Sequence, residues 1–330
     1  MRRREFIAGV GSAAAWPLVA RAQQRQTPPV IGYIDAGSAE ASADAVAVFR
    51  EGLSETGFVE GRNVTIEFRF AQSRIDRLPE FAADLARRKV AIIAALNVQA
   101  ALAARAADPT IPMVFHYGGD PAATRLIASL NQPGGNVTAV NSMNNGLLAK
   151  RLELLHEMVP RAERFAALVN SASADIESEP VTELQAAASA LGRQLEVLSV
   201  STNRDIDSAF ASLTQKQADA LIIGSGPLFR DRRVQLVTLA SRYGVPAIYA
   251  YRADAAAGGL MSYGANLSGM YSVIRTMGIY VGRILKGERA GDLPVQRATK
   301  FDFVINLKTA KALGLTIPPN LLALADEVIE

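Results

Sequence analysis

Two aspartates and two serines lie where either a helix or a ligand could use them. Asp120 is followed directly by Pro121, and this pair is typical of a helix start that the Asp side chain caps. The same carboxylate could pair with the ammonium group of a ligand, and Asp35 allows the same two interpretations. Ser38 and Ser42 precede or open a predicted helix, where a hydroxyl and N–H groups either cap the helix or hold a ligand carboxylate. All four are candidate ligand-binding residues.

Further candidates lie in segments that end or follow predicted strands. Asn97 and Gln99 can each donate and accept hydrogen bonds, and Arg252 could hold a carboxylate with its forked guanidinium. His116 follows an apolar run, so it could contact a ligand or respond to pH. Aromatic side chains offer flat surfaces to a ring. The remaining candidate ligand-binding residues are Tyr117, Asn170, Ser225, Tyr251 and Tyr263.

Signatures of enzymes and metal sites are missing from the sequence. The chain has no Cys, so it has no thiol nucleophile, no thiolate metal site and no disulfide. Its two histidines, His116 and His156, lie far apart without the spacing of a zinc motif. No G-x-S-x-G nucleophile elbow occurs. We therefore predict no catalysis, no metal and no cofactor.

Alternating strands and helices must position these residues. Short apolar runs such as 30–34 and 90–95 predict buried strands, and apolar spacing over 45–53 predicts a helix between them. The alternation starts again near residue 136 and predicts a second sheet of the same design. This order is typical of mostly parallel sheets covered by helices on both faces, where ligands bind beyond the carboxyl ends of strands. Periodicity alone does not tell to which of the two sheets the segments after residue 259 belong.

The first 22 residues have the three parts of an export signal, with a basic start, an apolar stretch over 7–20 and small residues at the end. Arg3-Arg4-Glu5-Phe6-Ile7 is similar to the twin-arginine motif, and the general secretory route is the alternative. The apolar stretch is too short to cross roughly 30 Å of hydrocarbon. We predict cleavage after Ala22 and a periplasmic mature protein that does not span the membrane.

The charge of the chain comes from this leader. The formal net charge is +3 with a pI near 9.2, yet the residues after position 22 contain equal numbers of basic and acidic side chains. Nucleic-acid binding needs a surplus of Lys and Arg gathered on one face. We therefore expect no nucleic-acid partner.

Several long motifs resemble those of the family of ABC-transporter substrate-binding proteins that includes the tryptophan-binding type. The resemblance covers essentially the whole chain after the leader. It rests on Phe49-Arg50-Glu51-Gly52-Leu53, Gly57-Phe58-Val59-Glu60-Gly61-Arg62-Asn63-Val64, Gln132-Pro133-Gly134-Gly135-Asn136-Val137-Thr138, Gly258-Gly259-Leu260-Met261-Ser262-Tyr263-Gly264 and Phe303-Val304-Ile305-Asn306-Leu307-Lys308-Thr309-Ala310.

This resemblance implies a type I periplasmic binding protein: two doubly wound parallel-sheet lobes joined by a hinge that the chain crosses several times. Lobe 1 would hold residues 29–137 plus 264–296, and lobe 2 residues 138–260 plus 299–330. The hinge crossings would lie near residues 138–141, 256–260 and 298.

The implied function is that of a monomeric periplasmic binding protein that closes on a small molecule and delivers it to an ABC permease in the inner membrane. By resemblance the ligand is an amino acid or a related carboxylate, with aromatic or branched types first, while sugars stay open. A sensory adaptor for a membrane receptor and an exported α/β enzyme are the alternatives.

Overall fold

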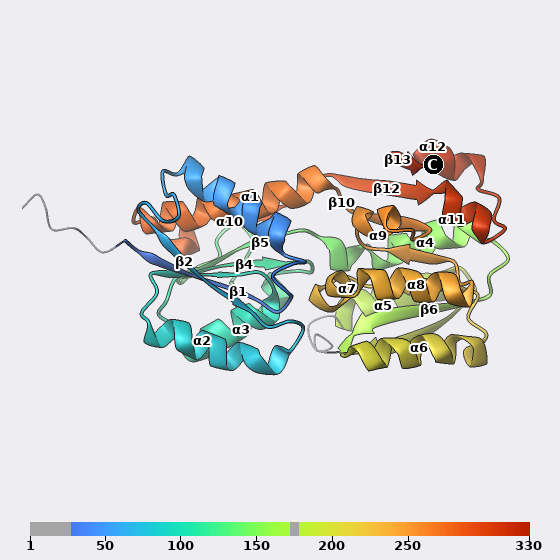
Figure 1. The fold of residues 1–330 in the computed structure, drawn as a ribbon, viewed down its shortest axis with the longest axis horizontal. Helices are drawn as coiled ribbons and strands as arrows, with labels where there is room; N and C mark the ends of the chain where they lie inside the picture. Colours follow the sequence, from blue (N-terminus) through green and yellow to red (C-terminus); the bar gives the residue numbers. More distant parts are fainter. Residues whose placement is uncertain (1–27, 172–177) are drawn as a thin grey trace, which may run out of the picture.

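The computed structural model describes residues 28–171 and 178–330, which form two α/β lobes arranged end to end (Figure 1). The predicted export signal, residues 1–22, lies outside the described residues. Within the described ranges, no helix is both long enough and apolar enough to cross a membrane.

The first lobe is built on a sheet whose described strands follow the order β11-β5-β4-β3-β1-β2, with every neighbouring pair parallel. The strands are β1 (Val30–Asp35), β2 (Thr65–Phe70), β3 (Ile92–Ala95), β4 (Met113–Tyr117), β5 (Val137–Asn141) and β11 (Gln296–Arg297). The helices are α1 (Ala43–Glu55), α2 (Leu78–Arg87), α3 (Val98–Ala107) and α10 (Leu267–Leu285), with short 3-10 turns η2 (Ile75–Arg77), η3 (Ala122–Thr124) and η6 (Ala290–Asp292).

The second lobe is built on a sheet of order β13-β12-β10-β9-β8-β6-β7, in which β12 runs antiparallel to β10 and the other described pairs are parallel. Its strands are β6 (Arg164–Asn170), β7 (Gln194–Val200), β8 (Ala220–Ile223), β9 (Ala247–Tyr249), β10 (Met261–Ala265), β12 (Phe301–Asn306) and β13 (Glu327–Ile329). Its helices are α4 (Leu148–Met158), α5 (Ser178–Ala190), α6 (Asn203–Lys216), α7 (Pro227–Asp231), α8 (Arg233–Tyr243), α9 (Arg252–Ala256), α11 (Leu307–Ala312) and α12 (Pro319–Leu324), with η4 (Asn144–Leu147) before α4.

Each sheet buries both of its faces, because side chains alternate along every strand. On β1, Ile31 and Tyr33 pack in a cluster with α1 and α10, whereas Ile34 packs in a second cluster with α2 and α3. The second lobe has the same two-sided arrangement around β6, where Phe165 and Ala166 belong to opposite clusters. The two doubly wound lobes that the family resemblance implied are confirmed by this architecture.

Helices α1 and α10 pack side by side, and glycines lie at their contact (Figure 1). A Cβ on Gly52 would lie 2.0 Å from the carbonyl oxygen of Arg275, and a Cβ on Gly278 would lie 2.2 Å from that of Phe49. These backbone contacts leave no room for a methyl group. The long helix that follows β10 is thereby fixed on the first lobe.

The chain passes between the lobes at three places in the described structure: after β5, between β10 and α10, and between β11 and β12. Residues 138–141 pair in the first sheet as part of β5, although the sequence interpretation assigned them to lobe 2. Residues 264 and 265 pair in the second sheet as part of β10, so this crossing follows residue 265 rather than lying near 256–260. The predicted boundaries differ from the observed ones because the crossings depend on pairing between strands far apart in the sequence. Periodicity does not report such pairing.

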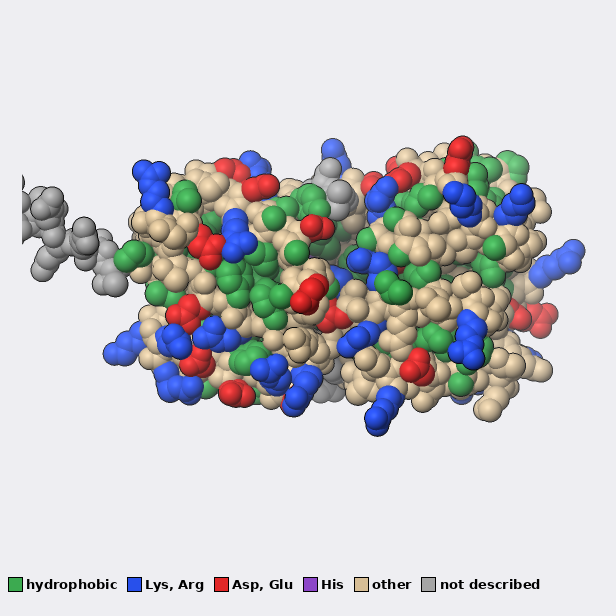
Figure 2. All heavy atoms as spheres, in the orientation of Figure 1, with side chains coloured by type: hydrophobic (Ala, Val, Ile, Leu, Met, Phe, Trp, Pro, Cys, Tyr) green, Lys and Arg blue, Asp and Glu red, His purple; other side chains and the backbone are tan. Residues whose placement is uncertain are grey.

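Acidic and basic side chains are interspersed on the face of the two lobes that Figure 2 shows. This face therefore shows no continuous basic surface of the kind that nucleic-acid binding needs.

Candidate ligand site between the lobes

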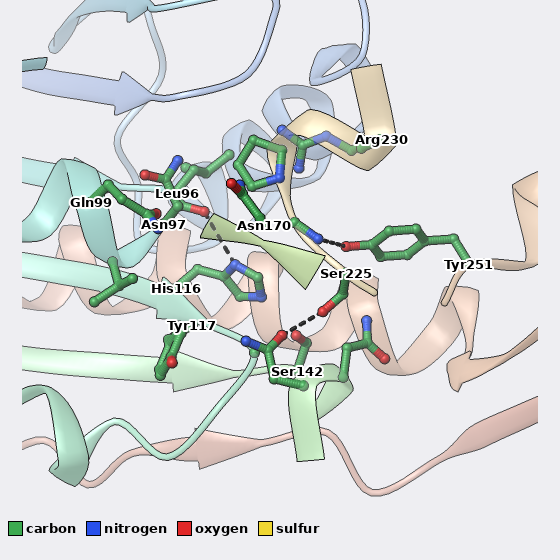
Figure 3. Close-up of a pocket in the computed structure, with 16 residues that line it drawn as sticks. Leu96, Asn97, Gln99, His116, Tyr117, Ser142, Asn170, Ser225, Arg230 and Tyr251 are labelled. Carbon is green, nitrogen blue, oxygen red and sulfur yellow. Dashed lines mark hydrogen bonds between the residues drawn. The ribbon is translucent and has the colours of Figure 1, made fainter. Parts of the chain in front are cut away.

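A cavity lies where the two lobes meet, beyond the carboxyl ends of their central strands (Figure 3). The first lobe contributes residues after β3 and at the end of β4, the second lobe contributes the ends of β6, β8 and β9, and the crossing after β5 forms part of the wall. Seven sequence candidates line it: Asn97, Gln99, His116, Tyr117, Asn170, Ser225 and Tyr251.

The cavity is small, at about 50 Å³. For comparison, an engineered dry cavity of about 150 Å³ binds benzene. A ligand larger than a few water molecules can therefore enter this cavity only when the lobes part or the lining moves.

His116 stands in the middle of the cavity wall with one ring nitrogen bound to the backbone (Figure 3). Its Nδ1 lies 3.3 Å from the carbonyl oxygen of Leu96. Burial lowers the pKa of His116 to about 4, so the ring is neutral at ordinary pH. The burial of His116 therefore does not support a pH-responsive role at ordinary pH.

Two hydrogen bonds hold the second-lobe side of the cavity. Ser225 donates to the side-chain oxygen of Asn145, which belongs to the crossing segment. The Tyr251 hydroxyl accepts from the N–H of Gly226 at 3.0 Å, and burial raises the pKa of Tyr251. Figure 3 shows both contacts. The loop after β8 is thus tied to the hinge and to the loop after β9.

Asp35 is fully buried and is not among the residues that line the cavity. Its Oδ1 accepts from Gly37 N–H and from Asn97 Nδ2, both at 2.9 Å. Its Oδ2 accepts from Ser42 Oγ at 2.5 Å and from Arg230 Nη2 at 3.1 Å. Four donors therefore satisfy this carboxylate, and the Ser42 hydroxyl is one of them.

A second cross-lobe contact lies beside the first. Asp231 of α7 accepts hydrogen bonds from the backbone N–H and the hydroxyl of Ser38 at 3.3 and 3.4 Å. It also accepts from the Ser73 hydroxyl at 2.8 Å. Ser38 is therefore engaged in joining the lobes, since α7 belongs to lobe 2 and both serines belong to lobe 1.

Three sequence candidates lie elsewhere. Asp120 is exposed, accepts from Ala122 N–H at 2.9 Å and lines a separate, adjoining cavity of about 310 Å³. Arg252 pairs with Glu327 at 2.6 Å. Tyr263 packs its ring 6.4 Å from that of Phe301.

The sequence interpretation missed Arg230, Asn144 and Asn145, all of which line the cavity. Pro227 opens the short helix α7 that carries Arg230, and a Pro at the first helical position is a usable signal for a helix start. The Asn-Asn pair lies in the crossing after β5, where its polar side chains had no strand pattern to mark them.

Asn144 is almost fully buried, and its Oδ1 accepts from the N–H of Ala265 at 2.8 Å. Three polar atoms of cavity-lining residues have no hydrogen-bond partner within the described chain: His116 Nε2, Asn144 Nδ2 and Arg230 Nε. Among the described residues, no cluster of three or more His, Cys, Asp or Glu side chains could hold a metal ion.

Two α/β lobes with doubly wound sheets, three crossings and a cavity at the crossings define a type I periplasmic binding protein. The model of the ABC transporter substrate binding protein family matches residues 5–329, and the chain belongs to this family.

Comparison with known proteins agrees with this membership. The chain is 25% identical over 267 residues to a tyrosine-binding protein of Clostridioides difficile, covering 81% of this chain and 75% of the relative. It is similar to an ABC domain in complex with L-Trp from Streptococcus pneumonia, with a TM-score of 0.81 and 24% identity over 92% of this chain and all of that one. The ligand-free, open structure of a substrate binding protein with adhesive properties from Clostridium difficile has a TM-score of 0.61 and 25% identity, covering 91% and 99%.

Proposed function

We propose that this chain is the periplasmic solute-binding protein of an ABC importer and that it captures an amino acid or a related small carboxylate between its lobes. The observation that carries the proposal is the cavity itself. Both lobes and a hinge crossing line it, and most of its lining side chains are polar. The tyrosine-binding relative and the L-Trp complex support an amino acid as the ligand.

Closure is the mechanism that this geometry supports. A ligand enters while the lobes are apart. Because it contacts both lobes only in the closed form, it binds that form more tightly and shifts the equilibrium toward it. The higher TM-score to the L-Trp complex than to the open, ligand-free structure agrees with a closed arrangement here. No chemical change of the ligand is part of this proposal.

Export and delivery complete the proposal. Residues 1–22 would direct the chain through the twin-arginine or general secretory route, with cleavage near Ala22. The closed monomer would then present both lobes to a permease in the inner membrane. Family membership supports this partner.

A thermal-shift screen tests the proposal. The chain from Gln23 onward is unfolded and refolded to remove any carried ligand, then heated with amino acids, aliphatic and aromatic carboxylates, and sugars. A ligand at about 100 times its Kd adds roughly 2.7 kcal/mol to the free energy of unfolding. We expect a rise of several degrees with amino acids or carboxylates. A rise with sugars alone would contradict the ligand class.

A further inference from the structure

Helix α7 carries side chains with which the second lobe contacts the first. Arg230 lies 3.1 Å from Asp35, and Asp231 accepts from the Ser73 hydroxyl at 2.8 Å. Figure 1 shows α7 on the side of the second lobe that faces the first. A helix of five residues has little stability of its own, so contacts outside it must fix its position.

The beginning of α7 is held by Tyr251. Gly226, the residue directly before the helix, donates its N–H to the Tyr251 hydroxyl at 3.0 Å, as Figure 3 shows. Gly226 has a φ of 128°, a backbone conformation that residues with a side chain rarely adopt. The chain therefore enters α7 through a turn that needs glycine and that Tyr251 fixes.

The end of α7 is held by Asp254. Arg233, two residues after the helix, places its Nε 2.9 Å from Oδ1 of the Asp254 carboxylate. The other carboxylate oxygen, Oδ2, accepts from the backbone N–H of Tyr251 at 3.3 Å. Asp254 itself is buried. One buried carboxylate thus holds the residue that follows α7 and also the tyrosine that holds the residue before it.

The protonation state of Asp254 depends on opposing effects. Burial raises its pKa to about 6, and the nearby Arg233 and Arg151 oppose this rise. The charged or titratable groups that act on Asp254 from the elements around it are Arg233 on α8, Arg151 on α4, Tyr249 on β9 and Tyr251 before α9. The carboxylate therefore pairs with cations but changes its charge only a little below neutral pH.

The remaining elements that pack against α9 are β10 and β12. The titratable residue of β10 is Tyr263, which packs against Phe301, and that of β12 is Asp302, which lies near Arg252. On α8, Arg242 and Tyr243 lie at the end of the helix opposite to Arg233. The cation that hydrogen-bonds to Asp254 is therefore Arg233, which follows α7.

We propose that Asp254 is a positioning residue: its ionised carboxylate fixes α7, and α7 in turn presents Arg230 and Asp231 to the first lobe. Protonation of Asp254 removes the charge that pairs with Arg233, so α7 loosens and the lobes part more readily as the pH falls. This inference rests on the proposed function only in taking closure of the lobes as the working motion.

Amide hydrogen exchange of the chain from Gln23 onward, without added ligand, tests whether Asp254 fixes α7. The exchange rate of the peptide spanning residues 225–233 is compared with the intrinsic rate at each pH, which gives a protection factor. From pH 7.5 to pH 5 we expect this factor to fall about three- to tenfold, as the loss of about one hydrogen bond to a charged group would produce. At pH 5 a group with a pKa of about 6 is mostly protonated. A protection factor that stays constant would overturn the proposal.

Two variants assign the change to Asp254. Asp254→Asn keeps one acceptor oxygen and replaces the other with an NH₂ group, so it cannot accept from both Arg233 and Tyr251. Its protection factor should be low and equal at the two pH values. Asp219→Asn is the matched control, because Asp219 also accepts from backbone N–H groups but lies before β8, at the end of the sheet away from the cavity. It should behave as the wild type does.

The other peptides of the second lobe distinguish positioning from plain stabilisation. If Asp254→Asn lowers protection equally throughout the lobe, Asp254 only stabilises the fold and the proposal is wrong. Loss of protection confined to residues 225–233 and the adjoining loop before α9 supports it. The pH comparison on the wild type decides even if a variant fails to fold.

The distance between the lobes tests the link from α7 to closure. Dyes attached to Glu80→Cys on α2 and Ser208→Cys on α6, both exposed positions, report energy transfer at pH 7.5 and pH 5 without ligand. We expect the population with the short distance to be smaller at pH 5, and to be independent of pH when Asp254→Asn is added. A distance distribution that is the same at both pH values would overturn the link to closure. Neither measurement uses a ligand, so failure of the proposed ligand class in the thermal-shift screen is a separate outcome.

Discussion

Asp35 in the first lobe and Arg230 in the second form an ion pair across the cleft, with Arg230 Nη2 3.1 Å from Asp35 Oδ2. The carboxylate is fully buried, whereas the Arg230 side chain is 22% exposed. The same Nη2 also lies 3.2 Å from the hydroxyl of Ser42, so one guanidinium nitrogen contacts two first-lobe side chains. This pair links closure of the lobes to the position of the cation that lines the cavity.

Replacing Asp35 tests how much the buried carboxylate contributes. In Asp35→Asn the charge is lost, and an NH₂ group must face some of the donors that the carboxylate satisfied. We expect the free energy of unfolding to fall by about 1–3 kcal/mol and ligand affinity to weaken. Urea denaturation measures the first effect. The nearby exposed Glu40→Gln is the control, and equal stability of the two variants would contradict the assignment.

Asp231 offers a cleaner test of closure, because it joins the lobes without lining the cavity. Asp231→Ala removes the acceptor for Ser38 and Ser73. We expect ligand release to accelerate about three- to tenfold, as the loss of about one net hydrogen bond would produce, with little change in the association rate. Stopped-flow measurements of both rates distinguish these effects. Asp292→Ala, which changes an acid on the first lobe alone, should leave both rates as they are.

His116 should make the free energy of unfolding depend on pH. Its pKa of about 4 in the folded protein lies below the ordinary 6.5, so the unfolded chain binds the proton more readily. The stability contributed by the neutral ring is full above pH 6.5 and is lost as pH falls toward 4. The stability difference between wild type and His116→Phe should therefore rise with pH across this window. A difference independent of pH would contradict the neutral, buried ring.

Asp254 should show the opposite trend. Burial raises its pKa to about 6 from 3.8, so the folded protein binds this proton more readily than the unfolded chain. Its contribution is full below pH 3.8 and is lost as pH rises through 6. The stability difference between wild type and Asp254→Asn should fall over that interval, as measured by denaturation at several pH values.

The close approach of α1 and α10 gives a prediction about the fold that carries the site. Gly278→Ala would bring a methyl group to 2.2 Å from the carbonyl oxygen of Phe49, so the helices must move apart. We expect a loss of about 1–3 kcal/mol in the free energy of unfolding. Gly146→Ala, whose new methyl would meet no heavy atom within 4 Å, is the control. A Gly278→Ala variant as stable as the control would contradict the packing.

Apolar runs and helical spacing predicted two α/β sheets, because both signals report locally which faces are buried. The arrangement in two lobes was implied by the family resemblance. The antiparallel pairing of β12 with β10 and the crossing after residue 265 depend on partners far along the chain. Local patterns do not report such pairings.

The candidate site could likewise be predicted only in part. Asn97, His116 and Tyr251 line the cavity because residues at and after the ends of parallel strands meet at one edge of a sheet. The partners of Asp35 and Arg252 could not be predicted, since Arg230 lies 195 residues from Asp35 and Glu327 lies 75 residues from Arg252. These contacts form only when the sheets and lobes are assembled.

Capture of a small molecule by closing lobes is the central claim, and single-molecule fluorescence energy transfer tests it most directly. The chain contains no Cys, so Glu80→Cys on α2 and Ser208→Cys on α6 give two exposed labelling sites, one on each lobe (Figure 1). The account predicts that the refolded protein samples open and closed distances, and that the compound with the largest thermal shift moves the population to the closed one. An unchanged distance distribution at saturating ligand would contradict the account.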